Sequence, residues 1–137
     1  MTDGILTIAG RNEAGYGICI DSADSWIVAV NNAGPDSDPA NAAFFGAHPN
    51  TDETFVLVSG AACIATAPHG EPEYFTVIPM ERGVCYNVRR NTWHTVLMAA
   101  GAKVVICENR NPEGERHDLS AEAKARLTKE AGNLLKR

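Results

Sequence analysis

Two histidines and a glutamate have the types and spacing to bind a metal ion. His48 and Glu53 flank the four-residue polar segment 49–52 in the stretch HPNTDETFVLVSG. If that segment closes a hairpin, the two residues lie opposite each other on paired antiparallel strands, with Cβ atoms roughly 5 Å apart. Their side chains can then share one ligand.

The alternation of side chains along each strand predicts that this pair faces the core. Glu53 shares its face with Phe55 and Leu57, and His48 shares its face with Phe44. Burying an isolated charge is costly, so a carboxylate in this position requires a hydrogen-bond partner, a proton or a metal ion.

A third candidate ligand, His94, lies in NTWHTVLMA, where its face-mates Val96 and Met98 are apolar. On a twisted antiparallel barrel this strand can close over the same cavity. Two imidazoles and one carboxylate suit Fe, Mn, Zn or Ni rather than Ca or Mg. The sequence therefore predicts a divalent transition metal on His48, Glu53 and His94. The alternative is a metal-free, hydrogen-bonded buried pair of His48 and Glu53.

Glu53 of the triad and three further residues are candidates for catalysis or substrate binding. Glu53, or a water bound to the metal, could serve as the base, and Tyr86 could offer its hydroxyl to a substrate. A core tyrosine satisfied by the backbone is the alternative for Tyr86. Arg89 or Arg90 could clamp a substrate carboxylate at the mouth of the barrel, or lie in a solvated turn.

Length and charge limit the classes of protein and partner. The 137 residues are enough for one domain with one core. The net charge of −5 and the lack of clustered Lys and Arg argue against nucleic acid, so we expect a small-molecule ligand. No apolar run reaches the roughly 20 residues of a membrane span, and no signal peptide is evident, so we expect no membrane association and a cytoplasmic location.

Eight short segments rich in β-branched and aromatic residues predict an all-β antiparallel fold, since no crossover segments separate them. They cover residues 25–31, 42–48, 54–60, 62–67, 73–78, 84–88, 92–99 and 102–109. We expect a barrel over 16–112, an N-terminal segment 1–15 with a possible added strand at ILTIA, and a helix within 113–137. Ser120 is the expected N-cap of that amphipathic helix.

Four cysteines, Cys19, Cys63, Cys85 and Cys107, lie 22 or more residues apart and form no C-x-x-C pair. Each sits in an apolar or β-like segment, where cysteine packs as a small hydrophobe. We expect four buried free thiols.

Two windows of the sequence resemble the motifs of the cupin superfamily. His48, PNTD, Glu53, TFVLVS and Gly60 follow the first motif, and Gly83, VCYNV, the segment 89–93 and His94 follow the frame of the second. The likeness covers roughly residues 20–112 and is greatest to small single-domain cupins of unassigned function. It implies a double-stranded β-helix, the jelly-roll barrel of the cupins, with the C-terminal helix outside the core pattern.

Four positions depart from the cupin motifs. Gly46 stands at the place of the first motif histidine, which leaves three protein ligands. Arg89 replaces a proline, Asn91 a glycine and Met98 an asparagine. A three-ligand site would bind its metal more weakly and would depend on water or substrate to complete the coordination shell.

The resemblance implies lyase, isomerase or dioxygenase chemistry on an oxygen-rich metabolite such as a ureido, keto, hydroxy or sugar acid. The missing histidine favours an alternative, a metal-free or regulatory cupin that binds a small molecule at a degenerate site. The family also implies a homodimer, in which ILTIA could be an exchanged strand.

Overall fold

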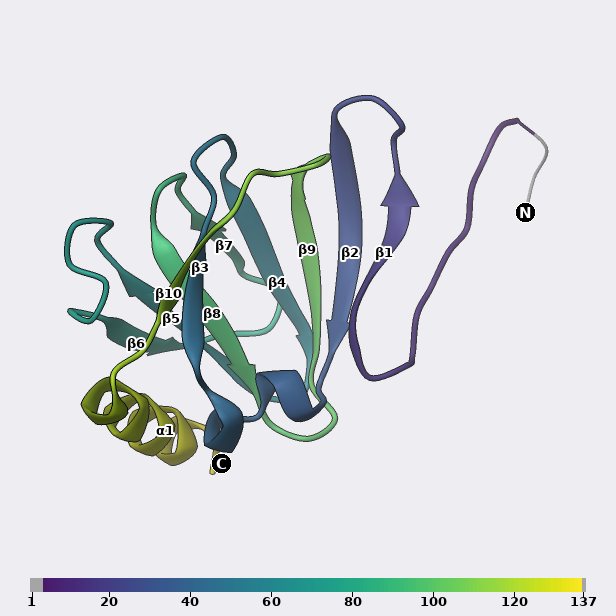
Figure 1. Ribbon diagram of the computed structural model, residues 1–137. Coiled ribbons are helices and arrows are strands. Elements are labelled where there is room, and N and C mark those ends of the chain that lie inside the picture. The colour runs from purple at the N-terminus through teal and green to yellow at the C-terminus, as the bar shows by residue number, and fades with distance from the viewer. Residues whose placement is uncertain (1–3, 137) are drawn as a thin grey trace.

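Ten strands form two antiparallel sheets that pack face to face in the computed structural model, which describes residues 4–136 (Figure 1). The first sheet has the order β1 (Gly15–Asp21), β2 (Trp26–Asn32), β9 (Lys103–Asn109), β4 (Glu53–Ser59) and β7 (Cys85–Val88). The second has the order β10 (Glu115–Asp118), β3 (Phe44–Ala47), β8 (Trp93–Met98), β5 (Ala62–Ala67) and β6 (Thr76–Pro79). This is the predicted all-β jelly-roll architecture.

One face of each central strand builds the core between the sheets. Along β4 the buried positions are Glu53, Phe55 and Leu57, which follow the period of two that a strand imposes. On β9 the buried partners are Val104, Ile106 and Glu108, each opposite one of the three. The core is therefore apolar along most of its length and carries two carboxyl groups at one end.

The helix α1 (Ala121–Leu135) covers the outer face of the second sheet (Figure 1). Its Ser120 N-cap is confirmed, since the Ser120 hydroxyl accepts a hydrogen bond from the Ala123 amide at 3.1 Å. Ala123, Leu127 and Ala131 form its buried stripe, at the predicted spacing of four residues. The triad lies on the opposite, inner face of this sheet.

Leu127→Ala is expected to lower the free energy of unfolding by about 2–5 kcal/mol, because Leu127 is 0% exposed and its loss would leave a cavity between α1 and the sheet. Urea denaturation provides the measurement. Leu134→Ala is the matched control, since Leu134 is only partly buried and should cost less. Equal losses in the two variants would contradict this account of the helix interface.

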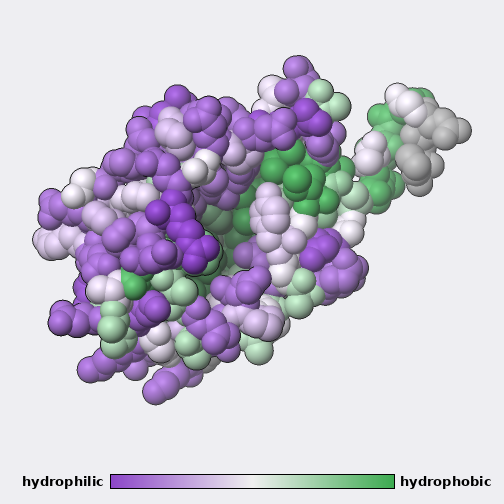
Figure 2. Space-filling view, viewed as in Figure 1, coloured by the Kyte–Doolittle hydropathy of each residue, from purple (hydrophilic) through white to green (hydrophobic). Residues whose placement is uncertain are grey.

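Two strands lie where the sequence predicted none. β1 follows the N-terminal segment, and β10 precedes α1 and pairs with β3. The strand predicted at 73–78 begins at Thr76. The apolar piece ILTIA forms no continuous strand. Leu6 makes a β-bridge, whereas Ile5 and Ile8 are 92% and 70% exposed on an arm that reaches away from the barrel (Figures 1 and 2).

The predicted hairpin between His48 and Glu53 is wrong. β3 pairs with β8 and β10, while β4 pairs with β7 and β9, so the segment 49–52 crosses from one sheet to the other. The polar groups of this segment bond to neighbouring strand ends instead of closing a turn. Asp52 accepts from the Arg90 amide at 2.9 Å, and the Thr51 hydroxyl accepts from the Asn109 amide at 3.2 Å.

Asn91 supports the same crossing. It adopts the left-handed conformation with φ 64°, which asparagine tolerates better than most residues, and its amide donates to the His48 carbonyl at 2.9 Å. Asn91 can thus occupy the glycine position of the motif without breaking the turn.

The expectation of four buried cysteines is met in part. All four thiols are free, but Cys63 alone among them is buried. Cys19 is half-buried, and Cys85 and Cys107 are exposed because they lie on the face of the first sheet that points away from the core. Between residues 4 and 136 there is no helix with the length and apolar content of a membrane span.

Candidate metal centre

His48, Glu53 and His94 converge at one end of the core, although they come from both sheets. His48 follows β3, Glu53 begins β4 and His94 lies on β8. The Oε1 atom of Glu53 lies 3.2 Å from His48 Nε2 and 2.9 Å from His94 Nε2. One donor atom from each residue falls within 4.8 Å of the other two. The structure thus brings together the three residues that the sequence singled out.

Backbone carbonyl groups orient both imidazole rings. His48 Nδ1 lies 2.7 Å from the Glu113 carbonyl oxygen, and His94 Nδ1 lies 3.0 Å from the Thr92 carbonyl oxygen. A carbonyl only accepts, so each Nδ1 carries a hydrogen and each Nε2 is the atom left to bind a metal. Both Nε2 atoms point at the Glu53 carboxylate, which gives the two-nitrogen, one-oxygen donor set of a transition-metal site.

The charges of the triad are coupled through Glu53. Burial opposes ionisation of this carboxyl, but hydrogen bonds from His48 and His94 outweigh burial and hold its pKa well below the usual range. The hydrogen bond with Glu53 raises the pKa of His48 to about 9, against the effect of burial. Without metal, an imidazolium at His48 therefore faces a carboxylate at Glu53.

Metal affinity is expected to rise with pH, because an ion must displace the proton on His48 Nε2. Since the pKa of His48 is about 9, the dissociation constant for Co²⁺ should fall about tenfold per pH unit from about pH 6 to 8 and level off near pH 9. Titration followed by Co²⁺ absorption measures this slope. An affinity that does not change with pH would contradict the proposed role of His48.

The free energy of unfolding of the metal-free protein is expected to fall as the pH rises above neutrality, whereas metal affinity rises. The folded-state pKa of His48 lies above its ordinary value of 6.5, so its stabilising contribution is complete below about pH 6.5 and is lost as the pH rises through about 9. The contribution of Glu53, whose pKa is lowered, is lost only in strong acid. Urea denaturation in EDTA at several pH values tests this, and constant stability from neutral pH to above 9 would contradict it.

Two residues of the site were missed by sequence reasoning. Glu108 is 8% exposed and lies opposite Glu53 on β9; burial, then the hydrogen bond and charge of Glu53, raise its pKa to about 8. Tyr16 on β1 lines the cavity that opens beside the triad, and its pKa is raised to about 12 by partial burial and by Glu108 and Glu53. The alternation of Val104 and Ile106 could have placed Glu108 on the inner face, whereas Tyr16 lies in a strand that was not predicted.

Three predicted residues lie away from the triad. The Tyr86 hydroxyl accepts a hydrogen bond from the Glu81 amide at 2.8 Å, which is the backbone-satisfied alternative, and Tyr86 lines a different cavity. Arg89 and Arg90 have side chains 78% and 60% exposed, and both pair with Asp52. Both arginines therefore lie in a solvated turn, which was the alternative to a substrate clamp in the sequence analysis.

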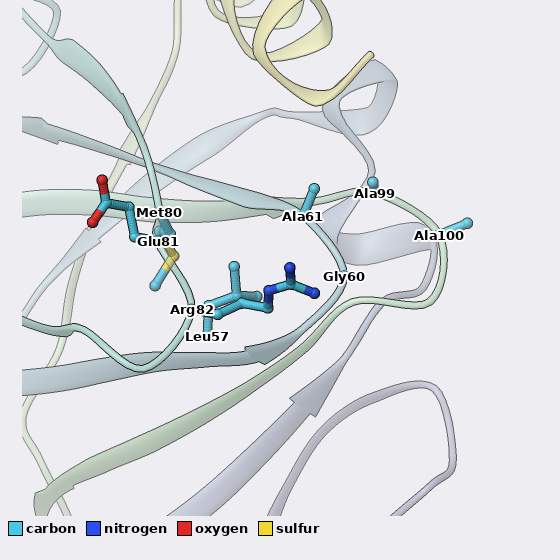
Figure 3. Close-up of a pocket in the computed structure, with 8 residues that line it drawn as sticks. All are labelled: Leu57, Gly60, Ala61, Met80, Glu81, Arg82, Ala99 and Ala100. Carbon is cyan, nitrogen blue, oxygen red and sulfur yellow. The ribbon is translucent and has the colours of Figure 1, made fainter. Parts of the chain in front are cut away.

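A cavity of about 400 Å³ opens beside the triad, within the size range of small-molecule sites. A hollow of about 570 Å³ lies at the opposite end of the barrel, by the turns that end β4 and β8. Figure 3 shows Arg82 reaching across it toward Gly60, with the Glu81 carboxylate away from it. None of the residues lining this second hollow belongs to the metal-ligating group found in residues 4–136.

Solved structures with similar folds are found although no family model and no curated protein matches the chain. They include the hydroxypropylphosphonic acid epoxidase from S. wedmorenis, with a TM-score of 0.54 and 18% identity over 69% of this chain and 49% of that one. The Fe(II) form of HppE with substrate has a TM-score of 0.56 and 18% identity over 80% and 60%. An oxalate decarboxylase has a TM-score of 0.53 and 20% identity over 82% and 30%.

These structures share the cupin fold. The chain has this fold too. The chain spans less than two thirds of the length of the chain in each of these three structures. At this level of identity the likeness establishes the architecture of the barrel and leaves the chemistry to be argued from the residues of this chain.

Proposed function

We propose that the protein is a metal-dependent cupin that binds a divalent transition metal, Fe, Mn, Zn or Ni, through His48, Glu53 and His94. The observation that carries this proposal is the convergence of both Nε2 atoms on Glu53, with both Nδ1 atoms held by backbone carbonyls. Such fixed tautomers are the usual support of metal-binding histidines. The similar structures include the Fe(II) form of HppE, which agrees with this donor set.

The proposed reaction is a lyase, isomerase or dioxygenase step on an oxygen-rich small metabolite. A metal held by His48, Glu53 and His94 would supply Lewis acidity toward a substrate oxygen. The chain provides the cavity, the neutral phenol of Tyr16 at its wall and the carboxyl of Glu108 beside Glu53. Apolar side chains such as Phe55 and Ile106 limit the access of water to the inner wall.

Elemental analysis of protein purified without chelator tests the metal proposal. We expect close to one equivalent of a transition metal, or its recovery after incubation with Fe²⁺, Mn²⁺, Zn²⁺ or Ni²⁺. His94→Ala should lose the metal, while His69→Ala, a change to a histidine outside the triad, should retain it. Less than about a tenth of an equivalent after reconstitution would overturn the proposal.

A metal-free binding protein is the second candidate, and one observation favours it. The triad is hydrogen-bonded without an ion, and among the described residues no buried polar side-chain atom lacks a partner. In that case the triad would serve as a buried polar network, and EDTA or added Zn²⁺ would leave the thermal unfolding temperature unchanged. A metal-dependent increase in that temperature would exclude this candidate.

We also propose that the chain forms a homodimer through the outer face of the first sheet. Val58 is 45% exposed there, and Cys85 and Cys107 are exposed as well, whereas α1 covers only the second sheet. Exposed apolar sheet faces commonly mark interaction surfaces. Light scattering should give twice the mass of the chain, and Val58→Lys should lower it. A monomer at about 10 µM would contradict the proposal.

A further inference from the structure

The cavity beside the triad has no lysine or arginine in its wall. Tyr16, Asn31 and Ser37 supply neutral polar groups, and Phe44 and Phe55 supply aromatic surface. An anionic substrate arm is normally held by a guanidinium or ammonium group. Within residues 4–136, this cavity provides none.

A carboxylate lines the cavity instead. Asp36 belongs to a short 3₁₀ turn, Pro35–Ser37, between β2 and β3. In the described part of the chain its side chain has no hydrogen bond and no ion pair, whereas the nearby Asp38 accepts a hydrogen bond from the Ala40 amide at 3.0 Å. The charge of Asp36 is therefore available to a ligand.

The nearby arginines do not offset this charge. The Arg116 guanidinium lies 3.9 Å from the centre of the Phe44 ring but is paired with Asp118 at 2.7 Å, and it is not part of the cavity wall. Arg89 and Arg90 pair with Asp52 outside the cavity. A carboxylate or phosphonate arm that extends beyond the triad would thus meet Asp36 and no lysine or arginine side chain of the cavity wall.

From these observations, and resting on the proposed function, we infer that the ligand presents oxygen atoms to the metal and a protonated amine to Asp36. The ring of Tyr16 lines the same cavity and suits a cation, because aromatic faces attract positive charge. The similar structures include proteins whose names refer to two anions, oxalate and a phosphonic acid. This chain would select a ligand of a different charge class.

Binding of compounds that share one chelating group and differ in the remote group tests the inference. 2-Hydroxybutyrate, 4-amino-2-hydroxybutyrate and malate share an α-hydroxy acid and end in a methyl, an ammonium and a carboxylate group. 5-Amino-2-hydroxypentanoate gives a longer amine arm. Calorimetry and Co²⁺ absorption on the Co²⁺-loaded protein would give each dissociation constant.

We expect at least one amine to bind about tenfold more tightly than 2-hydroxybutyrate, and malate to bind most weakly. Asp36→Asn should remove most of the amine preference without changing Co²⁺ affinity, and Asp24→Asn, an exposed control, should leave the preference unchanged. Tighter binding of malate than of the amines, or an amine preference that survives in Asp36→Asn, would overturn this inference and leave the proposed metal site untouched. Failure of the native protein to bind Co²⁺ would overturn the inference together with the proposed function.

Discussion

Glu53→Gln is expected to weaken Co²⁺ binding about 100-fold or more, equivalent to roughly 2.7 kcal/mol. Glu53 is the anionic donor of the triad, and its carboxylate contacts both Nε2 atoms. Glutamine keeps the size of the side chain but replaces the anionic oxygen with a neutral amide. An ion would then be held by two imidazoles and a weak carbonyl donor.

Calorimetric titration with Co²⁺, supported by elemental analysis, measures the loss. Glu71→Gln is the matched control, because this exposed glutamate lies in the loop between β5 and β6, away from the triad. Circular dichroism should show the same strand content in all three proteins. Native-like affinity in Glu53→Gln would mean that the ion binds elsewhere.

Gly46→His is expected to tighten Co²⁺ binding about 10- to 100-fold, since a fourth protein ligand would replace a bound water. Gly46 lies directly opposite His94 on the paired strands β3 and β8, so a side chain there points to the same face. A Cβ atom at Gly46 would come no closer than 3.8 Å to another group, the Glu115 carbonyl oxygen. The position therefore has room for a side chain.

Gly46→Ala provides the control for this gain. It adds the Cβ atom alone and should fold normally with a Co²⁺ affinity within about twofold of the native value. If Gly46→His bound Co²⁺ no better than Gly46→Ala, the side chain at this position would not reach the ion. In that case His48, Glu53 and His94 would remain the only protein ligands of the ion, and a histidine at position 46 would not add a fourth.

The sequence predicted that His48, Glu53 and His94 converge, and they do, but the hairpin from which this was argued is wrong. Residue type and spacing identified His48, Glu53 and His94, and period-two alternation correctly placed Glu53 with Phe55 and Leu57 on the buried face. Short sequence separation suggested strand pairing, yet the segment 49–52 joins different sheets. Pairing partners are set by the whole sandwich, which no local pattern contains.

The remaining differences have local causes. β1 carries glycines at both sides of Tyr16 and an irregular register between Ile18 and Ile20, which weaken its strand pattern. No strand was predicted between residue 113 and the Ser120 N-cap, because the sequence ERHD of β10 is polar and lies at the sheet edge beside β3. Arg89 and Arg90 could not be placed from sequence, because their pairing with Asp52 depends on the crossing segment.

The origin of the three ligands has a mechanical consequence. His48 and His94 belong to one layer of the sandwich and Glu53 to the other, so a bound cation would cross-link the two layers much as a disulfide would. The two sheets could then separate at this end only if the cation dissociated at the same time. Damage to the packing between the layers would empty the site before the strands themselves melt.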